Sequence, residues 1–226
     1  GPALFAITIQ DAVLRSKAQV EAQLPGKLDF VAFFLDDGMV TGDVEAVRLF
    51  CELFAKEAEK LGLKLSPNKC EVVPAAAQSA AFSPDLFPGF KWISNGSFKL
   101  LGAPLGEADF CTQETDKRRE SVQKLLHACA AYGHTQGALQ VLRQCASWGK
   151  LVYSARTVPP HLHESSLRAF GGDLRNTLEQ LLGDTLPERS WALAQLGVNH
   201  GGVGLREPSR HASAAFLWDE SSIEET

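Results

Sequence analysis

The feature that most constrains this chain is a run of six apolar residues followed by two adjacent aspartates. Residues 30–35 have the sequence Phe-Val-Ala-Phe-Phe-Leu, and Asp36, Asp37 and Gly38 follow directly. A short aromatic run bounded by turn residues is typical of a strand. Asp and Gly favour tight turns, so these three residues are predicted to turn the chain. Residues 39–41 then return as the second strand of a hairpin, and we expect the first strand to be buried.

Adjacent carboxylates at the end of such a strand place like charges close together. This arrangement is costly unless a cation or hydrogen bonds compensate it. Mg²⁺ (or Mn²⁺) is a natural partner, because it prefers oxygen ligands and keeps positions open for substrate phosphates. Asp36 and Asp37 are therefore candidate metal ligands. Without its context, Asp-Asp-Gly is also a good hairpin turn that needs no metal.

The hydrophobic pattern changes near residue 110. Before it, helices are predicted after Pro2 and after Asp43, strands or extended edges at residues 63–65 and 71–73, and a further short strand at residues 98–101. Beyond it, apolar residues recur at helical spacing, over residues 122–129, 139–152 and 167–181. We therefore predict an α+β fold with two domains, an α+β part at residues 1–110 and an all-helical part at residues 111–226.

Composition excludes several classes of protein. Hydrophobic residues make up 45% and charged residues 22% of the 226, as in an ordinary globular protein. No apolar run approaches the ~20 residues that span a bilayer, and no signal peptide is visible, so we expect no membrane and an intracellular location, nucleus or cytoplasm. Five cysteines without a CxxC pair argue against a zinc site or a disulfide framework. The only methionine is Met39 and the chain begins at Gly1, so we expect a piece of a longer polypeptide.

The net charge of −5 argues against nucleic acid as a partner, because neutralising phosphates takes Lys and Arg. The charge is unevenly distributed, however. Residues 1–114 carry the whole excess of acid, and residues 115–226 are balanced. An acidic, metal-binding part joined to a neutral part with local basic clusters is compatible with a polymerase.

Several segments occur in an order that suggests a family. They are Gly-Pro-Ala-Leu-Phe at residues 1–5, Phe-Leu-Asp-Asp at 34–37, Gly-Leu-Lys-Leu-Ser-Pro-Asn-Lys-Cys-Glu at 62–71, Lys-Leu-Leu-Gly at 99–102, Val-Leu-Arg-Gln-Cys-Ala at 141–146, Tyr-Ser-Ala-Arg-Thr at 153–157 and Gly-Gly-Val-Gly-Leu-Arg at 201–206. Together they make the chain resemble reverse transcriptases, in the LINE-like, non-LTR retrotransposon branch. The resemblance runs through essentially the whole chain.

The resemblance implies a fold and an activity. The fold would be a partial polymerase palm, with an antiparallel hairpin and helices at residues 1–110, followed by a helical thumb or connection region at 111–226. The activity would be RNA-directed DNA polymerisation. It adds dNTPs to the 3′-OH of a DNA primer on an RNA template, with two Mg²⁺ or Mn²⁺ ions.

The resemblance also assigns roles to single residues. Asp36 matches the metal-binding aspartate of the palm hairpin, Asp37 its supporting neighbour and Phe34 the aromatic residue before them. Lys69 matches a lysine thought to protonate or neutralise the departing pyrophosphate. Without the family pattern, Lys69 is equally an ordinary surface lysine.

Further candidates would contact primer and template. Leu101 and Gly102 match the strand that positions the primer terminus, although they also suit an ordinary strand end. The helical part opens with a basic cluster of four residues, Lys117, Arg118, Arg119 and Lys124. These are candidate phosphate contacts or, alternatively, a solvated helix start. The glycine run at 201–204 lacks the Gly-Lys-Ser/Thr ending of a phosphate loop, and we exclude that interpretation.

Two-metal polymerisation needs a further carboxylate, which in the family precedes the segment where this chain begins. We therefore expect the chain to depend on the upstream fingers and palm segment of its parent polypeptide, and not to polymerise DNA alone. Two alternatives stay open. One is a non-catalytic remnant or domesticated palm–thumb that binds nucleic acid or protein. The other is an unrelated two-Asp metal hydrolase, which the lack of a third ligand disfavours.

Overall fold

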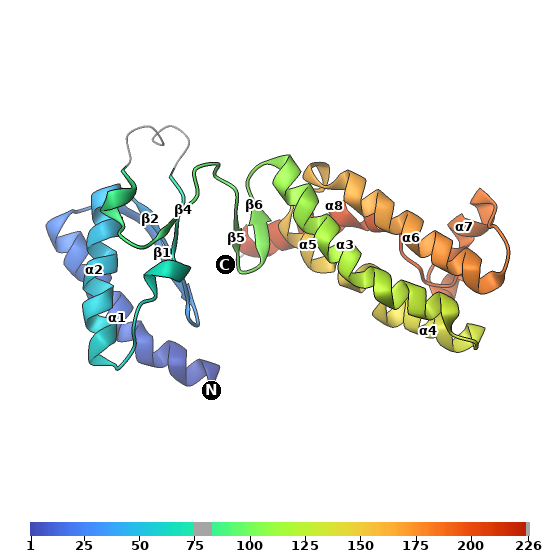
Figure 1. The fold of residues 1–226 in the computed structure, drawn as a ribbon, viewed down its shortest axis with the longest axis horizontal. Helices are drawn as coiled ribbons and strands as arrows, with labels where there is room; N and C mark the ends of the chain where they lie inside the picture. Colours follow the sequence, from blue (N-terminus) through green and yellow to red (C-terminus); the bar gives the residue numbers. More distant parts are fainter. Residues whose placement is uncertain (75–82, 225–226) are drawn as a thin grey trace. The chain divides into compact units, whose positions relative to one another are not determined.

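The computed structural model of the protein describes residues 1–74 and 83–224. By contacts the chain forms two compact units, residues 1–95 (unit 1) and 96–226 (unit 2), and each is described by itself. Within the described residues the fold is mostly helical α+β, with strands in two-stranded sheets (Figure 1). The predicted α+β class is confirmed at this level. The same part of the chain contains no helix long and apolar enough to cross a membrane.

Unit 1 is built on two helices and a hairpin. Its elements are α1 (Pro2–Gln23), β1 (Leu28–Phe34), β2 (Asp37–Gly42), α2 (Val44–Lys60), β3 (Glu71–Val72) and β4 (Lys91–Trp92), with 3₁₀ turns at Pro67–Lys69 and Pro84–Leu86. Proline is tolerated at the start of α1 because the N–H it lacks has no partner there. The predicted helices and the β1–β2 hairpin are confirmed. Of the two segments predicted as strands or extended edges, residues 71–72 form β3, which pairs in parallel with β4, and residues 63–65 are not part of a strand.

The core of unit 1 lies on one face of the β1–β2 hairpin. Phe33 points into it, with its ring centroid 5.0 Å from that of Phe54 and 6.4 Å from that of the buried Phe50 on α2. Alternate strand residues point to opposite faces, so Phe30 and Phe34 lie on the other face and are 52% and 64% exposed. The prediction of a buried first strand is therefore wrong for that face.

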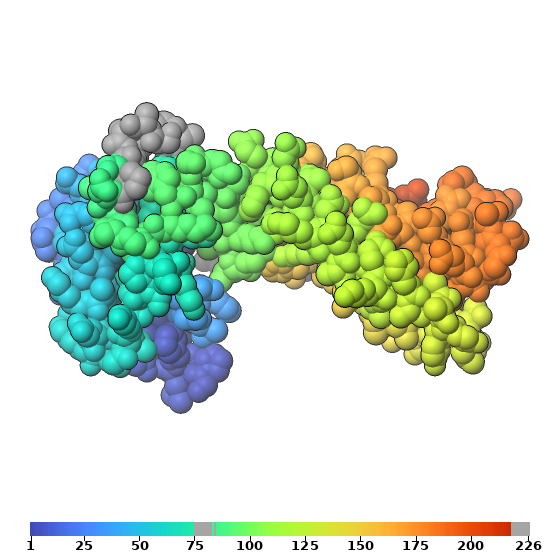
Figure 2. Space-filling model, viewed as in Figure 1, coloured from blue at the N-terminus to red at the C-terminus, as the bar shows by residue number. Residues whose placement is uncertain are grey.

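The first turns of α1 also carry exposed apolar side chains. Leu4 and Ile7 are both exposed, whereas Ile9 and Ala12 further along the helix are buried. Figure 2 shows this beginning of α1, in dark blue, projecting from the rest of unit 1. Unit 1 therefore has two apolar surfaces outside its core.

Unit 2 begins with a second hairpin and continues as helices. Its elements are β5 (Phe98–Leu100), β6 (Ala103–Leu105), α3 (Ala108–Ala131), α4 (Thr135–Cys145), α5 (Val152–Thr157), α6 (Glu164–Leu182), α7 (Glu188–Ala194) and α8 (Pro208–Glu224), with 3₁₀ turns at Trp148–Lys150, Pro160–Leu162 and Val198–His200. The helical periodicity of residues 139–152 predicted one helix, but α4 ends at Cys145. The chain then bends at Ser147, whose hydroxyl donates back to the Arg143 carbonyl. Helices pack around a core that includes the fully buried Leu142, Phe170 and Leu205.

Side chains join the β5–β6 hairpin to α3, the first long helix of unit 2. Lys99 of β5 forms an ion pair with Glu114 of α3, and Arg118 donates a hydrogen bond to the Gly102 carbonyl. The division between units therefore falls at residues 95–96, ahead of the predicted boundary at 110–111. The assignment of the two parts as palm and thumb stays a prediction.

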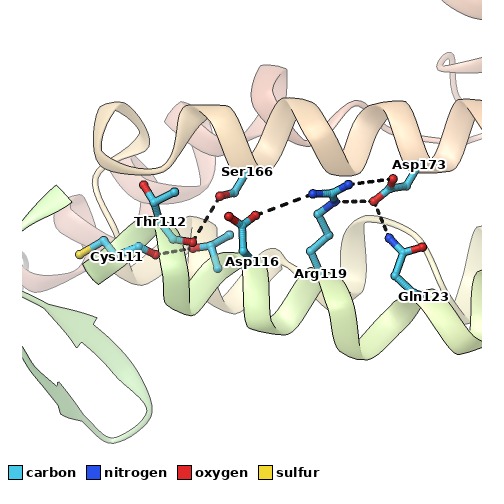
Figure 3. A network of polar contacts seen from close by, with 8 residues as sticks. Cys111, Thr112, Asp116, Arg119, Gln123, Ser166 and Asp173 are labelled. Carbon is cyan, nitrogen blue, oxygen red and sulfur yellow. Dashed lines mark hydrogen bonds and ion pairs between the residues drawn. The ribbon is translucent and has the colours of Figure 1, made fainter. Parts of the chain in front are cut away.

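Polar contacts also join α3 to α6 (Figure 3). Arg119 of α3 and Asp173 of α6 form an ion pair, and Gln123 donates a hydrogen bond to the same carboxylate. About two turns of helix earlier along the pair, the Ser166 hydroxyl donates to the Thr112 carbonyl. These contacts fix how the two longest helices of unit 2 lie against each other.

Candidate metal and nucleic-acid site

The predicted turn lies one residue earlier than the Asp-Asp-Gly sequence suggests. Phe34 pairs with Asp37 in the antiparallel register, so Leu35 and Asp36 form the two-residue turn. Leu35 has a φ of +57° and Asp36 does not have a positive φ, which is the pattern of a type II′ turn. A leucine in this left-handed region is strained, by roughly 1–2 kcal/mol.

Gly38 has a packing role and is not part of the turn. It lies in β2 opposite Phe33, and a Cβ at this position would come within 2.5 Å of the Phe33 ring. The aromatic ring therefore lies over the glycine, as aromatic residues often do across a strand pair. Gly38 is needed so that Phe33 can enter the core.

The two carboxylates lie at the turn end of the β1–β2 hairpin. Asp36 and Asp37 are both exposed, and neither carboxylate makes a hydrogen bond or ion pair with any residue in 1–74 or 83–224. Because Asp37 pairs with Phe34, the side chains of Asp37 and Phe34 project from the same face of the hairpin. This is the face that α1 and α2 leave uncovered. Within the described ranges no lysine or arginine forms an ion pair with either aspartate, whereas several other carboxylates of unit 1 have such a partner.

The donor set fits a Mg²⁺ or Mn²⁺ ion in part. Carboxylate oxygens are the ligands that these ions prefer, and Mg²⁺ is often held by only one or two carboxylates plus waters and substrate phosphates. Among the described residues, no group of three or more His, Cys, Asp or Glu side chains gathers in a metal-binding arrangement. Asp36 and Asp37 are thus suited to a partial site that a further ligand completes.

Lys69 ends the 3₁₀ turn Pro67–Lys69 and is exposed. No hydrogen bond or ion pair within the described part of the chain joins it to Asp36 or Asp37. The structure therefore leaves its predicted role in neutralising pyrophosphate as a prediction.

The second hairpin of the chain carries the other strained turn. Leu100 pairs with Ala103, so Leu101 and Gly102 form a two-residue turn with φ values of +49° and +84°. Two positive φ values are typical of a type I′ turn. Leu101 is 49% exposed, so its side chain is presented to solvent.

Both carbonyls of this turn are held by side chains from the helices. The Tyr153 hydroxyl donates to the Leu101 carbonyl at 2.7 Å, and the Arg118 guanidinium donates to the Gly102 carbonyl at 2.6 Å. Arg118 also donates to the Ser154 hydroxyl at 2.8 Å and lies 4.8 Å from the centroid of the Tyr153 ring. A cation over an aromatic face adds to the attraction. The turn is therefore held rigidly against α3 and α5.

The other three residues of the basic cluster differ in whether their side chains have partners. Lys117 forms an ion pair with Glu114 at 2.6 Å, and Arg119 is paired with Asp173. Lys124 is exposed, and its side chain makes no hydrogen bond or ion pair with residues of the described ranges. Three of the four predicted phosphate contacts thus have partners inside unit 2, and Lys124 is the one available to an external phosphate.

The buried carboxylate of Glu114 is shared between two lysines. Burial acts to raise its pKa, but hydrogen bonds from Lys117 and Lys99, with their charges, outweigh burial and lower the pKa below its ordinary value. Glu114 is therefore ionised at neutral pH, and it connects the hairpin strand β5 to α3.

Sequence reasoning missed Tyr153 as a residue that holds the Leu101–Gly102 turn. It also gave no role to Arg206, which lines a cavity with Arg143. No spacing signal reveals these relationships, because Tyr153 and Leu101 lie 52 positions apart and meet only through packing. Comparisons with protein-family models, with curated proteins and with solved structures give no match.

Proposed function

We propose that this chain is part of an RNA-directed DNA polymerase, and that its β1–β2 hairpin binds divalent metal ions through Asp36 and Asp37. One observation carries the proposal: two exposed carboxylates without partners among the described residues stand at the tip of a strained hairpin. Strained backbone persists where the surrounding structure imposes it, and it concentrates at functional sites. An ordinary two-residue turn would place glycine, asparagine or aspartate where this chain has Leu35.

In this proposal the chain's own residues orient the reactants. Asp36 and Asp37 would hold Mg²⁺ or Mn²⁺, whose charge would activate a primer 3′-OH and stabilise the leaving pyrophosphate. Phe34 offers an exposed aromatic face beside the carboxylates. Leu101 and Gly102 contact the primer, and the side chains of α3 and α5 that bind the carbonyls of their turn keep them in position.

The apolar surfaces of unit 1 suit a further polymerase segment. Phe30 and Phe34 on the outer face of the hairpin, and Leu4 and Ile7 on α1, are exposed large apolar side chains. Exposed apolar surface of this kind marks places where another polypeptide packs. We infer that a segment of the same polymerase covers it and supplies the third carboxylate, so that this chain alone does not polymerise DNA.

The second candidate function is a non-catalytic module that binds nucleic acid. It is favoured by the absence of a third acidic, histidine or cysteine ligand near the pair within residues 1–74 and 83–224. It predicts primer–template binding that does not respond to metal ions.

The metal role is tested by Mn²⁺ titration, monitored by electron paramagnetic resonance. Asp36→Asn is expected to weaken Mn²⁺ binding by about tenfold or more, because one of two anionic ligands is lost. The matched control is Asp11→Asn, which removes an equally exposed carboxylate from α1 and should leave Mn²⁺ binding unchanged. Equal Mn²⁺ affinity in the two variants would remove the metal role from the hairpin.

The polymerase role is tested by primer extension on an RNA template. The coding sequence upstream should add an aspartate-bearing strand, and the extended protein should incorporate dNTPs in Mg²⁺. Asp36→Asn should abolish incorporation, whereas Asp11→Asn should not. If the extended protein binds primer–template but incorporates nothing, the binding module is the correct function.

A further inference from the structure

Unit 2 contains a cavity that the proposed polymerase chemistry does not use. Its volume is about 340 Å³, and its walls come from two segments, the end of α4 with the following 3₁₀ turn, and residues 197–206. Small-molecule sites in proteins measure about 300–1,000 Å³. The cavity is therefore large enough for a ligand of moderate size.

The charged residues that line the cavity are all positive, although the chain as a whole is negatively charged. Arg143 and Arg206 line the cavity, and no acidic residue does. Neither guanidinium has a hydrogen bond or ion pair with a carboxylate in the described part of the chain, whereas Arg119 and Arg175 are paired. A guanidinium cannot lose its charge, and the half-buried Arg143 is partly removed from water. In a protein with a net charge of −5, two arginines in one cavity without acidic partners indicate a site for an anion.

Local packing sets the position of one of the two arginines. Gly204 has a φ of +82°, and a Cβ there would lie 3.0 Å from the Arg143 Cδ atom. Glycine at this position therefore leaves room for the arginine stem beside the backbone. The neighbouring Gly149 and Gly197 also line the cavity, so its walls include backbone that a ligand can approach closely.

An aromatic ring completes the site. Trp148 lines the cavity and is half-buried. Its ring lies 5.8 Å from the His211 ring on α8, at an interplanar angle of 51°. This contact holds the indole in place from one side. A guanidinium pair binds phosphate well, and an aromatic face stacks on any base. Phosphate and base together define a nucleotide.

We propose that this cavity binds one nucleotide of a single-stranded nucleic acid, with its phosphate on Arg143 and Arg206 and its base against Trp148. Arg206 and Gly149 are exposed, so the cavity is open to solvent and a continuous strand can enter it. The site is independent of metal binding at Asp36 and Asp37, and it holds whether or not the polymerase assignment is correct.

Binding is measured by fluorescence anisotropy with the full chain and a labelled oligothymidylate of about 12 nucleotides. The variant Arg143→Gln with Arg206→Gln should weaken binding by about tenfold or more. The slope of log K against log salt should also fall by about 0.7, because the one phosphate that the two arginines hold contributes about 0.7 on a single strand. The matched control is Arg189→Gln with Lys17→Gln, which removes the same charge from exposed positions and should change the affinity by less than about twofold.

The stacking role is tested at Trp148. Trp148→Ala should weaken oligonucleotide binding by about tenfold, and Trp148→Phe should restore most of it, because stacking on an aromatic ring contributes strongly and tolerates different rings. Thermal unfolding of both variants identifies any loss of folding, and the phenylalanine variant keeps the test valid if the alanine variant unfolds.

Three results would overturn the proposal. The first is an equal loss of affinity in the double-arginine variant and its control. The second is a Trp148→Phe variant that folds but binds no better than Trp148→Ala. The third is binding of inorganic phosphate or thymidine monophosphate without binding of the oligonucleotide, which would assign the cavity to small phosphate compounds. Oligonucleotide binding is measured without divalent metal ions, so failure of the metal proposal and failure of this one are distinguishable.

Discussion

Arg119 on α3 donates two hydrogen bonds to the Asp173 carboxylate on α6, at 2.5 Å from Nε and 3.0 Å from Nη2. Gln123 donates a third, at 2.7 Å. The carboxylate is 16% exposed, so water competes weakly for it. Hydrogen bonding to Asp173 raises the Arg119 pKa further above its ordinary value, while burial acts in the opposite direction. This ion pair therefore connects two helices that are 54 positions apart in the sequence.

Asp173→Asn should lower the free energy of unfolding by about 2 kcal/mol, because it leaves Arg119 with only its longer ion pair to Asp116, at 3.9 Å. The change is measured by urea denaturation. The control is Glu164→Gln, which breaks the exposed pair between Glu164 and Arg168 on α6 and should cost only about 0.3–0.5 kcal/mol. Similar losses in the two variants would contradict a structural role for the α3–α6 contact.

Tyr153→Phe should loosen the Leu101–Gly102 turn. It removes the hydroxyl that donates to the Leu101 carbonyl and leaves the ring beneath Arg118. We expect a loss of about 1 kcal/mol, together with faster amide hydrogen exchange in residues 98–105 and unchanged exchange in α6. Tyr132→Phe, at an exposed position, is the control and should alter neither. Unchanged exchange in the hairpin of the Tyr153 variant would contradict the role given to this hydroxyl.

Leu101→Asn should stabilise the protein by about 1 kcal/mol, because asparagine accepts the left-handed conformation of a type I′ turn better than leucine does. Little packing is lost, since Leu101 is half-exposed. Thermal unfolding measures the gain. Leu101→Val is the opposing variant and should destabilise, because a β-branched residue fits a positive φ poorly. Two variants of equal stability would show that the turn stores no strain.

Acidification should destabilise the protein through His163. Burial lowers the pKa of this histidine from 6.5 to about 4, so the folded protein keeps it neutral where the unfolded chain binds a proton. Its contribution to stability is complete above about pH 6.5 and is lost as the pH falls from there to about 4. Urea denaturation at several pH values checks the slope.

His163→Asn should flatten that slope, because the titrating group is removed while a polar side chain remains beside the Thr115 hydroxyl, which lies 3.0 Å from His163 Nδ1. Glu114 contributes at lower pH, since its lowered pKa means that its stabilisation is lost only below its ordinary value of 4.5. If the free energy of unfolding changes with pH between 6.5 and about 5 equally in the variant and in the natural protein, other groups cause the change.

Residue types and spacing determined the local structure of this chain. The helix after Pro2, the helix after Asp43 and the strand at residues 30–35 follow from periodicity and from turn residues, because these signals depend on neighbours in the sequence. Asp43 is the N-cap residue of α2, as a residue of this type before a helix predicts. Its carboxylate accepts a hydrogen bond from Lys27 at 3.0 Å, however, and makes no capping hydrogen bond to its own helix.

Packing decided the details of the candidate site. The Asp-Asp-Gly sequence indicates a turn, but the turn is shifted to Leu35 and Asp36 because the Phe33 ring enters the core over Gly38. A shift of one residue changes which side chains share a face of the hairpin. The sequence pattern identified the pair of carboxylates, and the core of unit 1 decided how they are presented.

Arg118 and Arg119 show most clearly what the sequence determines and what only the tertiary structure decides. The sequence by itself determined that two adjacent positive charges lie in the first half of a helix. Only the tertiary structure decided that Arg118 holds the Gly102 carbonyl, 16 positions away, and that Arg119 pairs with Asp173, 54 positions away. Successive helix residues point in different directions, so adjacent arginines meet different neighbours, and those neighbours are brought to them only when the apolar core closes.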